Sequence, residues 1–134
     1  MSENTIFEIN VKIDNVTEVK GGKAIVYFVS FHGEVNAPIF TGKVISDAVD
    51  TQIHYENGLK ILSARYILEG VDSENNRCRI FIENNGIEKD GKITTTPTII
   101  TDSPVLKYLE TAQLSGSVIS SNEDIIIKIF EENR

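Results

Sequence analysis

Three polar side chains of different chemistry, Asp50, Gln52 and His54, stand two residues apart, and Arg65 follows in the next segment. An arginine can hold a carboxylate through two parallel hydrogen bonds, a glutamine amide can both donate and accept, and an aspartate can orient the arginine. If these groups share an enclosed face, they form a candidate ligand-binding site. His54 would add acid–base chemistry to it.

The pairing of two neighbouring segments, 51–56 and 59–70, decides whether these residues share a face. Asn57-Gly58 joins the segments, and this dipeptide tolerates positive φ at both centres of a two-residue hairpin turn. Such a turn pairs Glu56 with Leu59 and places Asp50 opposite Arg65. A slip of one residue would exchange the two faces of the hairpin. The predicted apolar face is Ile53, Tyr55, Leu62, Ala64, Tyr66 and Leu68, and the predicted polar face is Asp50, Gln52, His54, Ser63, Arg65 and Glu69 with Ile61 and Ile67.

Two interpretations of the polar face remain open. In the first, it faces solvent, and Asp50 and Arg65 form an exposed pair that contributes at most about 1 kcal/mol. The residues alone favour this interpretation. In the second, the face lies inside a barrel, where its groups converge on a small ligand. Ile61 and Ile67 favour the second interpretation, because a fully solvated face needs no such pair.

The elements that must position these residues are strands. Ile, Val and Thr are abundant and Leu and Ala are few, which favours pleated structure over helix. Alternation and turn residues predict strands at 7–13, 23–31, 38–45, 51–56, 59–70, 77–84, 92–101, 113–120 and 124–132, with one reversal marked by Asn85-Gly86 and Asp90-Gly91 together and another at 121–123. Pro97 lacks a ladder donor and implies an edge or a bulge. We therefore expect an all-β, antiparallel β-barrel of roughly 8–10 strands with one short helical turn near 104–110.

Length and charge bound the possible functions. The 134 residues predict one domain spanning 1–134, and the single cysteine, Cys78, excludes an intrachain disulfide. The net charge of −7 with scattered Lys and Arg argues against nucleic acid and against anionic membranes as partners. No apolar run approaches the roughly 18 residues of a membrane span, and the polar start of the sequence predicts a cytoplasmic location.

The remaining polar residues do not suggest a metal or a cofactor. His32 and His54 are the only histidines, and they show no zinc-ligand spacing with Cys78. Asp47 and Asp50 fall far short of an oxygen cage for a hard cation. We expect His32 at the surface and Cys78 as a small buried hydrophobe, and we attribute Glu83, Asn84 and Asn85 to turn chemistry.

Several motifs are spread over most of the chain: Gly42–Gln52, Ala64-Arg65-Tyr66-Ile67-Leu68-Glu69, Asn84-x-Gly86, Thr96-Pro97, Leu114-Ser115-Gly116 and Ile127–Glu131. In their order and spacing they resemble one bacterial family, the domain-of-unknown-function family 3237, also called uncharacterised protein family 0311. Asp47-Ala48 replaces the Gly-Gly of the family pattern, Thr51 replaces its tryptophan and Thr94 replaces an arginine. The resemblance implies an antiparallel β-barrel and no established activity.

Three functional hypotheses follow. The first is a barrel that binds a small, acidic and partly apolar molecule through Asp50, Gln52, His54 and Arg65, without a cofactor. The second is a cofactor-independent enzyme of the cyclase or isomerase type that uses the same cavity. The third is a structural module that self-associates through edge strands near Pro97 or at the C-terminus.

Overall fold

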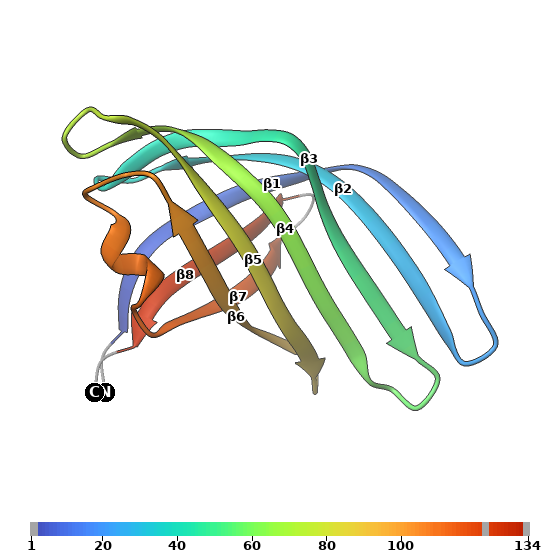
Figure 1. The fold of residues 1–134 in the computed structure, drawn as a ribbon. Helices are drawn as coiled ribbons and strands as arrows, with labels where there is room; N and C mark the ends of the chain where they lie inside the picture. Colours follow the sequence, from blue (N-terminus) through green and yellow to red (C-terminus); the bar gives the residue numbers. More distant parts are fainter. Residues whose placement is uncertain (1–2, 122–123, 133–134) are drawn as a thin grey trace.

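Eight antiparallel strands form a closed barrel in which neighbours in the sequence are neighbours in space (Figure 1). The computed structural model describes residues 3–121 and 124–132. β1 pairs with β8 and completes the ring. The predicted all-β, antiparallel barrel is confirmed, with eight strands. They are β1 (Glu3–Lys20), β2 (Ala24–Asn36), β3 (Phe40–Tyr55), β4 (Lys60–Asp72), β5 (Arg77–Lys89), β6 (Lys92–Thr101), β7 (Leu114–Ser121) and β8 (Asp124–Glu132), with the 3-10 turn η1 (Lys107–Glu110) between β6 and β7.

Two predicted interruptions of strands are wrong. The segments 38–45 and 51–56 belong to one strand, β3, whose register with β4 shifts between Ile45 and Val49. Asn85-Gly86, predicted to mark a reversal together with Asp90-Gly91, lies instead inside β5. A Cβ at Gly86 would overlap the carbonyl oxygen of Thr94 on β6, so this glycine serves close strand approach rather than a turn.

The reversal predicted at Asp90-Gly91 is confirmed. Both residues have positive φ, 55° and 76°, and Lys89 pairs with Lys92 across them. This is the two-residue turn whose twist suits a hairpin. The last predicted reversal, at 121–123, includes residues outside the described ranges.

Two ladders of the closed barrel are short, so parts of their strands have an unpaired edge. β6 pairs with β7 only at Thr94 and Thr95, so Pro97 lies beyond the end of that ladder and needs no donor there. This confirms the predicted edge at Pro97. The ladder between β1 and β8 ends at Val11, so within the described ranges the rest of β1 pairs only with β2. β8 pairs on both sides, so the expected C-terminal edge is wrong. Self-association through edges stays a prediction.

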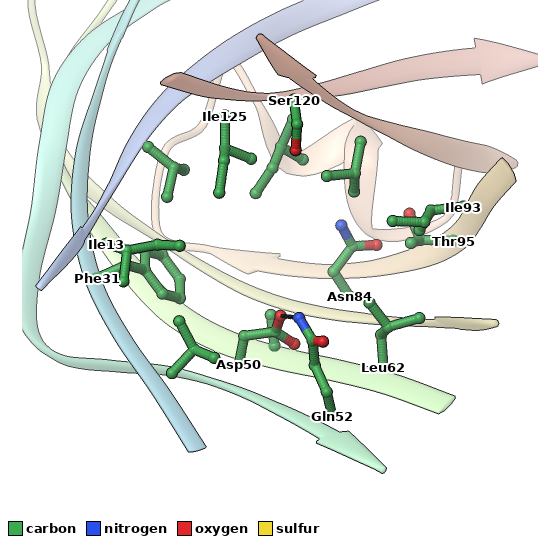
Figure 2. A pocket seen from close by; sticks show the side chains of 15 residues that line it. Ile13, Phe31, Asp50, Gln52, Leu62, Asn84, Ile93, Thr95, Ser120 and Ile125 are labelled. Carbon is green, nitrogen blue, oxygen red and sulfur yellow. Dashed lines mark hydrogen bonds between the residues drawn. The ribbon is translucent and has the colours of Figure 1, made fainter. Parts of the chain in front are cut away.

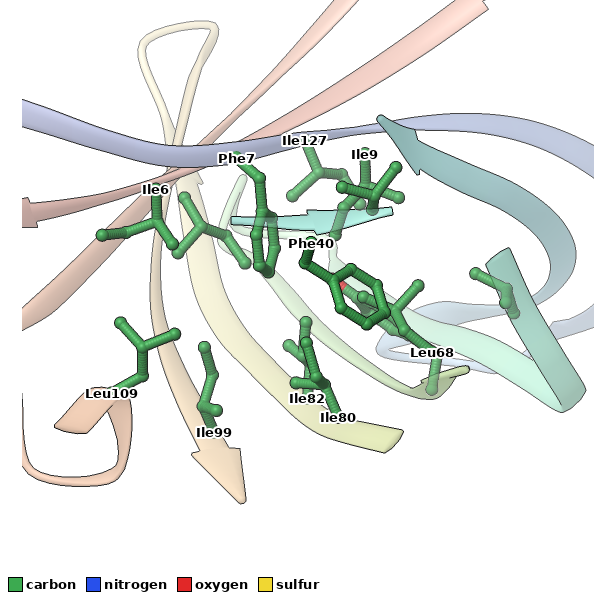
Figure 3. Packing of buried hydrophobic residues seen from close by; sticks show 14 of the residues in the cluster. Ile6, Phe7, Ile9, Phe40, Leu68, Ile80, Ile82, Ile99, Leu109 and Ile127 are labelled. Atoms are coloured by element: carbon green, nitrogen blue, oxygen red, sulfur yellow. The ribbon is translucent and has the colours of Figure 1, made fainter. Parts of the chain in front are cut away.

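The interior of the barrel divides into two halves, one enclosing a cavity (Figure 2) and one filled with apolar side chains (Figure 3). The filled half is covered at its end by the segment that contains η1, through Leu106 and Leu109. Full burial of one such side chain contributes about 1.5–3 kcal/mol. The largest buried side chains of this half are Phe7, Ile9, Phe40, Leu68, Ile80, Ile82, Ile99, Leu106, Leu109 and Ile129.

One buried carboxylate fastens this cover to the barrel. The Ser103 hydroxyl donates to Asp72 at 2.6 Å, and the backbone N–H groups of Glu74 and Asn76 donate to the same carboxylate at 2.9 and 3.0 Å. Ser103 also accepts from the backbone N–H of Leu106 at 3.1 Å. Burial on its own would raise the pKa of Asp72, but the hydrogen bonds outweigh it and lower the pKa to about 2.

The turn between β3 and β4 differs from the predicted one. Tyr55 donates to the carbonyl of Leu59 at 2.8 Å, and Gly58 donates to the carbonyl of Tyr55 at 3.0 Å, so the loop has three residues rather than two. Only Gly58 adopts positive φ, +96°, while the Asn57 side chain accepts from the backbone N–H of Leu59 at 3.0 Å. The third loop residue shifts the register by one, so that Asp50 pairs with Ala64 and Val49 with Arg65.

The left-handed backbone conformation of Gly58 in this turn can be tested by substitution. Gly58→Ala places a Cβ on a left-handed residue, and we expect a loss of about 1–2 kcal/mol in the free energy of unfolding, measured by urea denaturation. Gly22→Ala is the matched control, because a Cβ there meets no atom within 4 Å and its φ is not left-handed. Equal losses in the two variants would contradict this account of the turn.

The role of the buried Asp72 carboxylate can be tested by measuring stability at several pH values. Because folding lowers the pKa of Asp72 from 3.8 to about 2, its stabilisation is complete above pH 3.8 and is lost as the pH falls through about 2. We expect Asp72→Asn to be less stable than wild type at pH 7, by urea denaturation, with the difference shrinking between about pH 4 and pH 2. Asp90→Asn, at a turn position that asparagine also suits, should stay close to wild type. A difference that does not vary over this range would contradict the role of the charge.

Candidate functional site

The second half of the barrel encloses a cavity of about 150 Å³. Its wall is mainly apolar, with a few polar groups, and it reaches solvent at a rim where Ile13 is 49% exposed. Figure 2 shows Asp50 and Asn84 pointing into the same space from β3 and β5. The lining residues are Val11, Ile13, Val29, Phe31, Asp50, Gln52, Leu62, Ala64, Asn84, Ile93, Thr95, Val118, Ser120, Ile125 and Ile127.

Asp50, Gln52 and His54 form a hydrogen-bonded chain along the inner face of β3. Nε2 of Gln52 donates to Asp50 Oδ2 at 2.7 Å, and His54 Nε2 lies 3.1 Å from Gln52 Oε1. A carboxylate only accepts, so the Gln52 atom beside it is the amide nitrogen, and the amide oxygen faces the histidine. His54 Nε2 therefore carries a proton and donates. The side chain of His54 also contacts Tyr27 edge-on, with ring centroids 4.8 Å apart.

The pKa of the Asp50 carboxyl group is raised above its usual value. Burial raises its pKa, while hydrogen bonds from the Gln52 side chain and the Ser63 backbone partly offset that rise. Tyr66 is 2% exposed. Its burial, and to a smaller extent repulsion from the Asp50 charge, raises the pKa of its hydroxyl. Burial is thus the dominant influence on both groups.

Two further polar side chains of the cavity are buried without partners. Asn84 is 3% exposed and Thr95 is 7% exposed, and neither Asn84 Oδ1 nor Thr95 Oγ1 has a hydrogen-bond partner among the described residues. A buried polar atom left unpaired costs about 1–3 kcal/mol. The sequence interpretation missed both residues. The alternation of Cys78, Ile80 and Ile82 with Asn84 could have placed Asn84 on the inner face of its strand.

Arg65 does not join this site, and the predicted pairing with Asp50 is wrong. Its side chain lies on the outer face of β4, 68% exposed, and donates to Glu83 of β5 at 2.7 Å. The cause is the three-residue turn, which places Ala64, not Arg65, opposite Asp50. Asp50, Gln52 and His54 are brought together as the sequence suggested, but on the same face as Leu62 and Ala64.

The other candidate residues lie elsewhere. His32 is exposed, and its Nδ1 forms a hydrogen bond with Oδ1 of Asp14 at 2.6 Å, as expected of a surface histidine. Cys78 is a free, buried cysteine in the filled half, as predicted. Among the described residues, no group of three or more His, Cys, Asp or Glu side chains is arranged to hold a metal ion. Likewise, none of the helices in the described ranges is long and apolar enough to cross a bilayer.

The fold and the site define a class: small antiparallel β-barrels with an internal cavity of mixed polarity. No family model matches the chain. A curated protein of Clostridium acetobutylicum, named as a UPF0311 protein, is 26% identical over 98% of this chain and 94% of its own length. The resemblance to uncharacterised protein family 0311 is therefore confirmed.

Solved structures share the whole fold. A protein with unknown function from Clostridium acetobutylicum superposes with a TM-score of 0.84 at 24% identity, covering 99% of this chain and 100% of that one. A β-barrel-like protein from Acinetobacter baumannii gives 0.80 at 17% identity over 97% and 94% of the two chains. An enzyme from Penicillium herquei gives 0.69 at 15% identity over 98% and 96%. At these identities the likeness shows the fold alone.

Because the pKa of Asp50 is raised, ionisation of this carboxyl group is expected to lower the stability of the folded protein as the pH rises. Stability from this group is complete below the unfolded-chain pKa of 3.8 and is lost as the pH rises through the higher folded-state value. We expect Asp50→Asn to gain stability relative to wild type between pH 3 and pH 7, measured by urea denaturation. Asp47→Asn, an exposed replacement on the same strand, is the matched control. A gap between Asp50→Asn and wild type that is equal at both pH values would contradict the assignment.

Proposed function

We propose that this protein binds a small, largely apolar molecule inside the barrel. The observation that carries the proposal is the pair of buried, unpartnered atoms, Asn84 Oδ1 and Thr95 Oγ1, in the wall of an otherwise apolar cavity. A ligand with a polar group could restore the hydrogen bonds that these atoms lack, while its apolar part fills the remaining space.

The volume of the cavity limits the ligand to about one ring. An apolar protein cavity of about 150 Å³ accommodates benzene, and the cavity here has about the same volume. Its apolar wall, which includes Val29, Leu62 and Ile127, matches the faces of such a ring. Binding would also stabilise the fold, because the ligand has no comparable site on the unfolded chain.

A second candidate function is catalysis by acid–base chemistry at Asp50, of the cyclase or isomerase type and without a cofactor. The chain from Asp50 through Gln52 to His54 favours it. If Asp50 takes up a proton, the Gln52 amide can rotate by about 180°, accept from Asp50 and donate to His54 Nε2, provided that the neutral ring then carries its proton on Nδ1. The Penicillium herquei enzyme supports this candidate only by sharing the fold.

Binding can be tested by thermal denaturation with benzene and phenol at increasing concentration. We expect Tm to rise, with stabilisation of about 2.7 kcal/mol when the ligand is a hundredfold above Kd. Ala64→Leu and, from β7, Val118→Phe fill the cavity and should abolish the rise. Arg65→Ala, on the outer face, should keep it.

A flat response of the wild-type protein, or a rise that persists in both filled variants, would contradict binding in the cavity. Circular dichroism confirms that each variant is folded. Proton NMR of the bound compounds during prolonged incubation separates the two candidate functions, because an enzyme acting on them would generate new signals that Asp50→Asn removes.

A further inference from the structure

The cavity lacks the arginine that was expected beside Asp50. With Arg65 on the outer face, Asp50 is the only ionisable side chain among the described residues that line the cavity. Lys60, which precedes Leu62 by two residues on the inner face of β4, is itself paired with Glu88 at 3.2 Å. An acidic ligand would therefore bring a second negative charge into a weakly polar space that already holds one.

The hydrogen-bonding capacity of the wall points the same way. Asp50 accepts from the Gln52 side chain and the Ser63 backbone, but a carboxylate has about four acceptor positions, so acceptor capacity remains. Asn84 Oδ1 can only accept, and Thr95 Oγ1 can accept or donate. Figure 2 shows these side chains converging on one space from β3, β5 and β6. A ligand group placed between Asp50 and Asn84 Oδ1 must therefore be a donor.

We propose that the site, provided that it binds ligands as argued above, selects an uncharged single-ring molecule that carries a hydroxyl or N–H group, and that Asp50 determines this selectivity. The donor group lies between Asp50 and Asn84, and the ring packs on the apolar wall. A carboxylate of the same size is rejected by repulsion from Asp50. A plain hydrocarbon leaves the polar atoms unpaired.

Two pairs of nearly isosteric probes test this selectivity by isothermal titration calorimetry at pH 7. Phenol and toluene differ in a donor, and benzamide and benzoate differ in a negative charge. We expect phenol to bind at least about tenfold more tightly than toluene, since a hydrogen bond to a charged group is the stronger kind. We expect benzamide to exceed benzoate by a similar factor.

Asp50→Asn retains the shape of the side chain and removes its charge, so both ratios should fall toward one. Arg65→Ala is the control and should leave both ratios unchanged, because its guanidinium lies outside the barrel. Equal or tighter binding of toluene or benzoate in the wild-type protein, or unchanged ratios in Asp50→Asn, would overturn the selectivity while leaving cavity binding intact. Failure of all four probes and of benzene to bind at millimolar concentration would instead overturn the proposed function.

Discussion

The three-residue turn at Glu56–Gly58 determines what the barrel interior contains. Side chains alternate between the two faces of a strand, so an offset of one residue in the pairing exchanges the inward and outward groups of one strand relative to those of its partner. Gly58, at φ +96°, supplies the left-handed residue that closes this turn. The resulting register directs Asp50 inward beside Ala64 and leaves Arg65 outside with Glu83. The acidic character of the cavity follows from this register.

The barrel itself could be predicted because its signals are local. Alternating β-branched residues mark strands wherever they pair, and Asp90-Gly91 adopts the turn that its residue types favour. Asn57-Gly58 is compatible with two turns that differ in the sign of φ at Asn57, and the local sequence does not choose between them. The choice depends on packing across β3 and β4, so the grouping of Asp50 with Arg65 failed while that of Asp50 with Gln52 and His54 held.

Asn84 escaped prediction for a related reason. It continues the inward alternation of Ile80 and Ile82, but Asn85-Gly86 directly after it has the composition of a turn. What keeps β5 extended is its pairing with β6, where Gly86 lies against the backbone of Thr94. Pairing between strands is a tertiary constraint, and a glycine required for close approach cannot be distinguished in one sequence from a glycine required for a turn.

The inner face of β5 changes from apolar to polar where the filled half of the barrel ends. Cys78, Ile80 and Ile82 are buried in the filled half, and the next inward residue, Asn84, faces the cavity with an unpartnered oxygen. A further isoleucine would continue the apolar packing without an unpaired polar atom, and the same holds for Asp50 on β3. Both side chains reduce the stability of the empty barrel at positions where apolar residues would fit the pattern of their strands. Departures of this kind concentrate at functional sites, because groups that are costly in the empty protein are the ones that a ligand can satisfy.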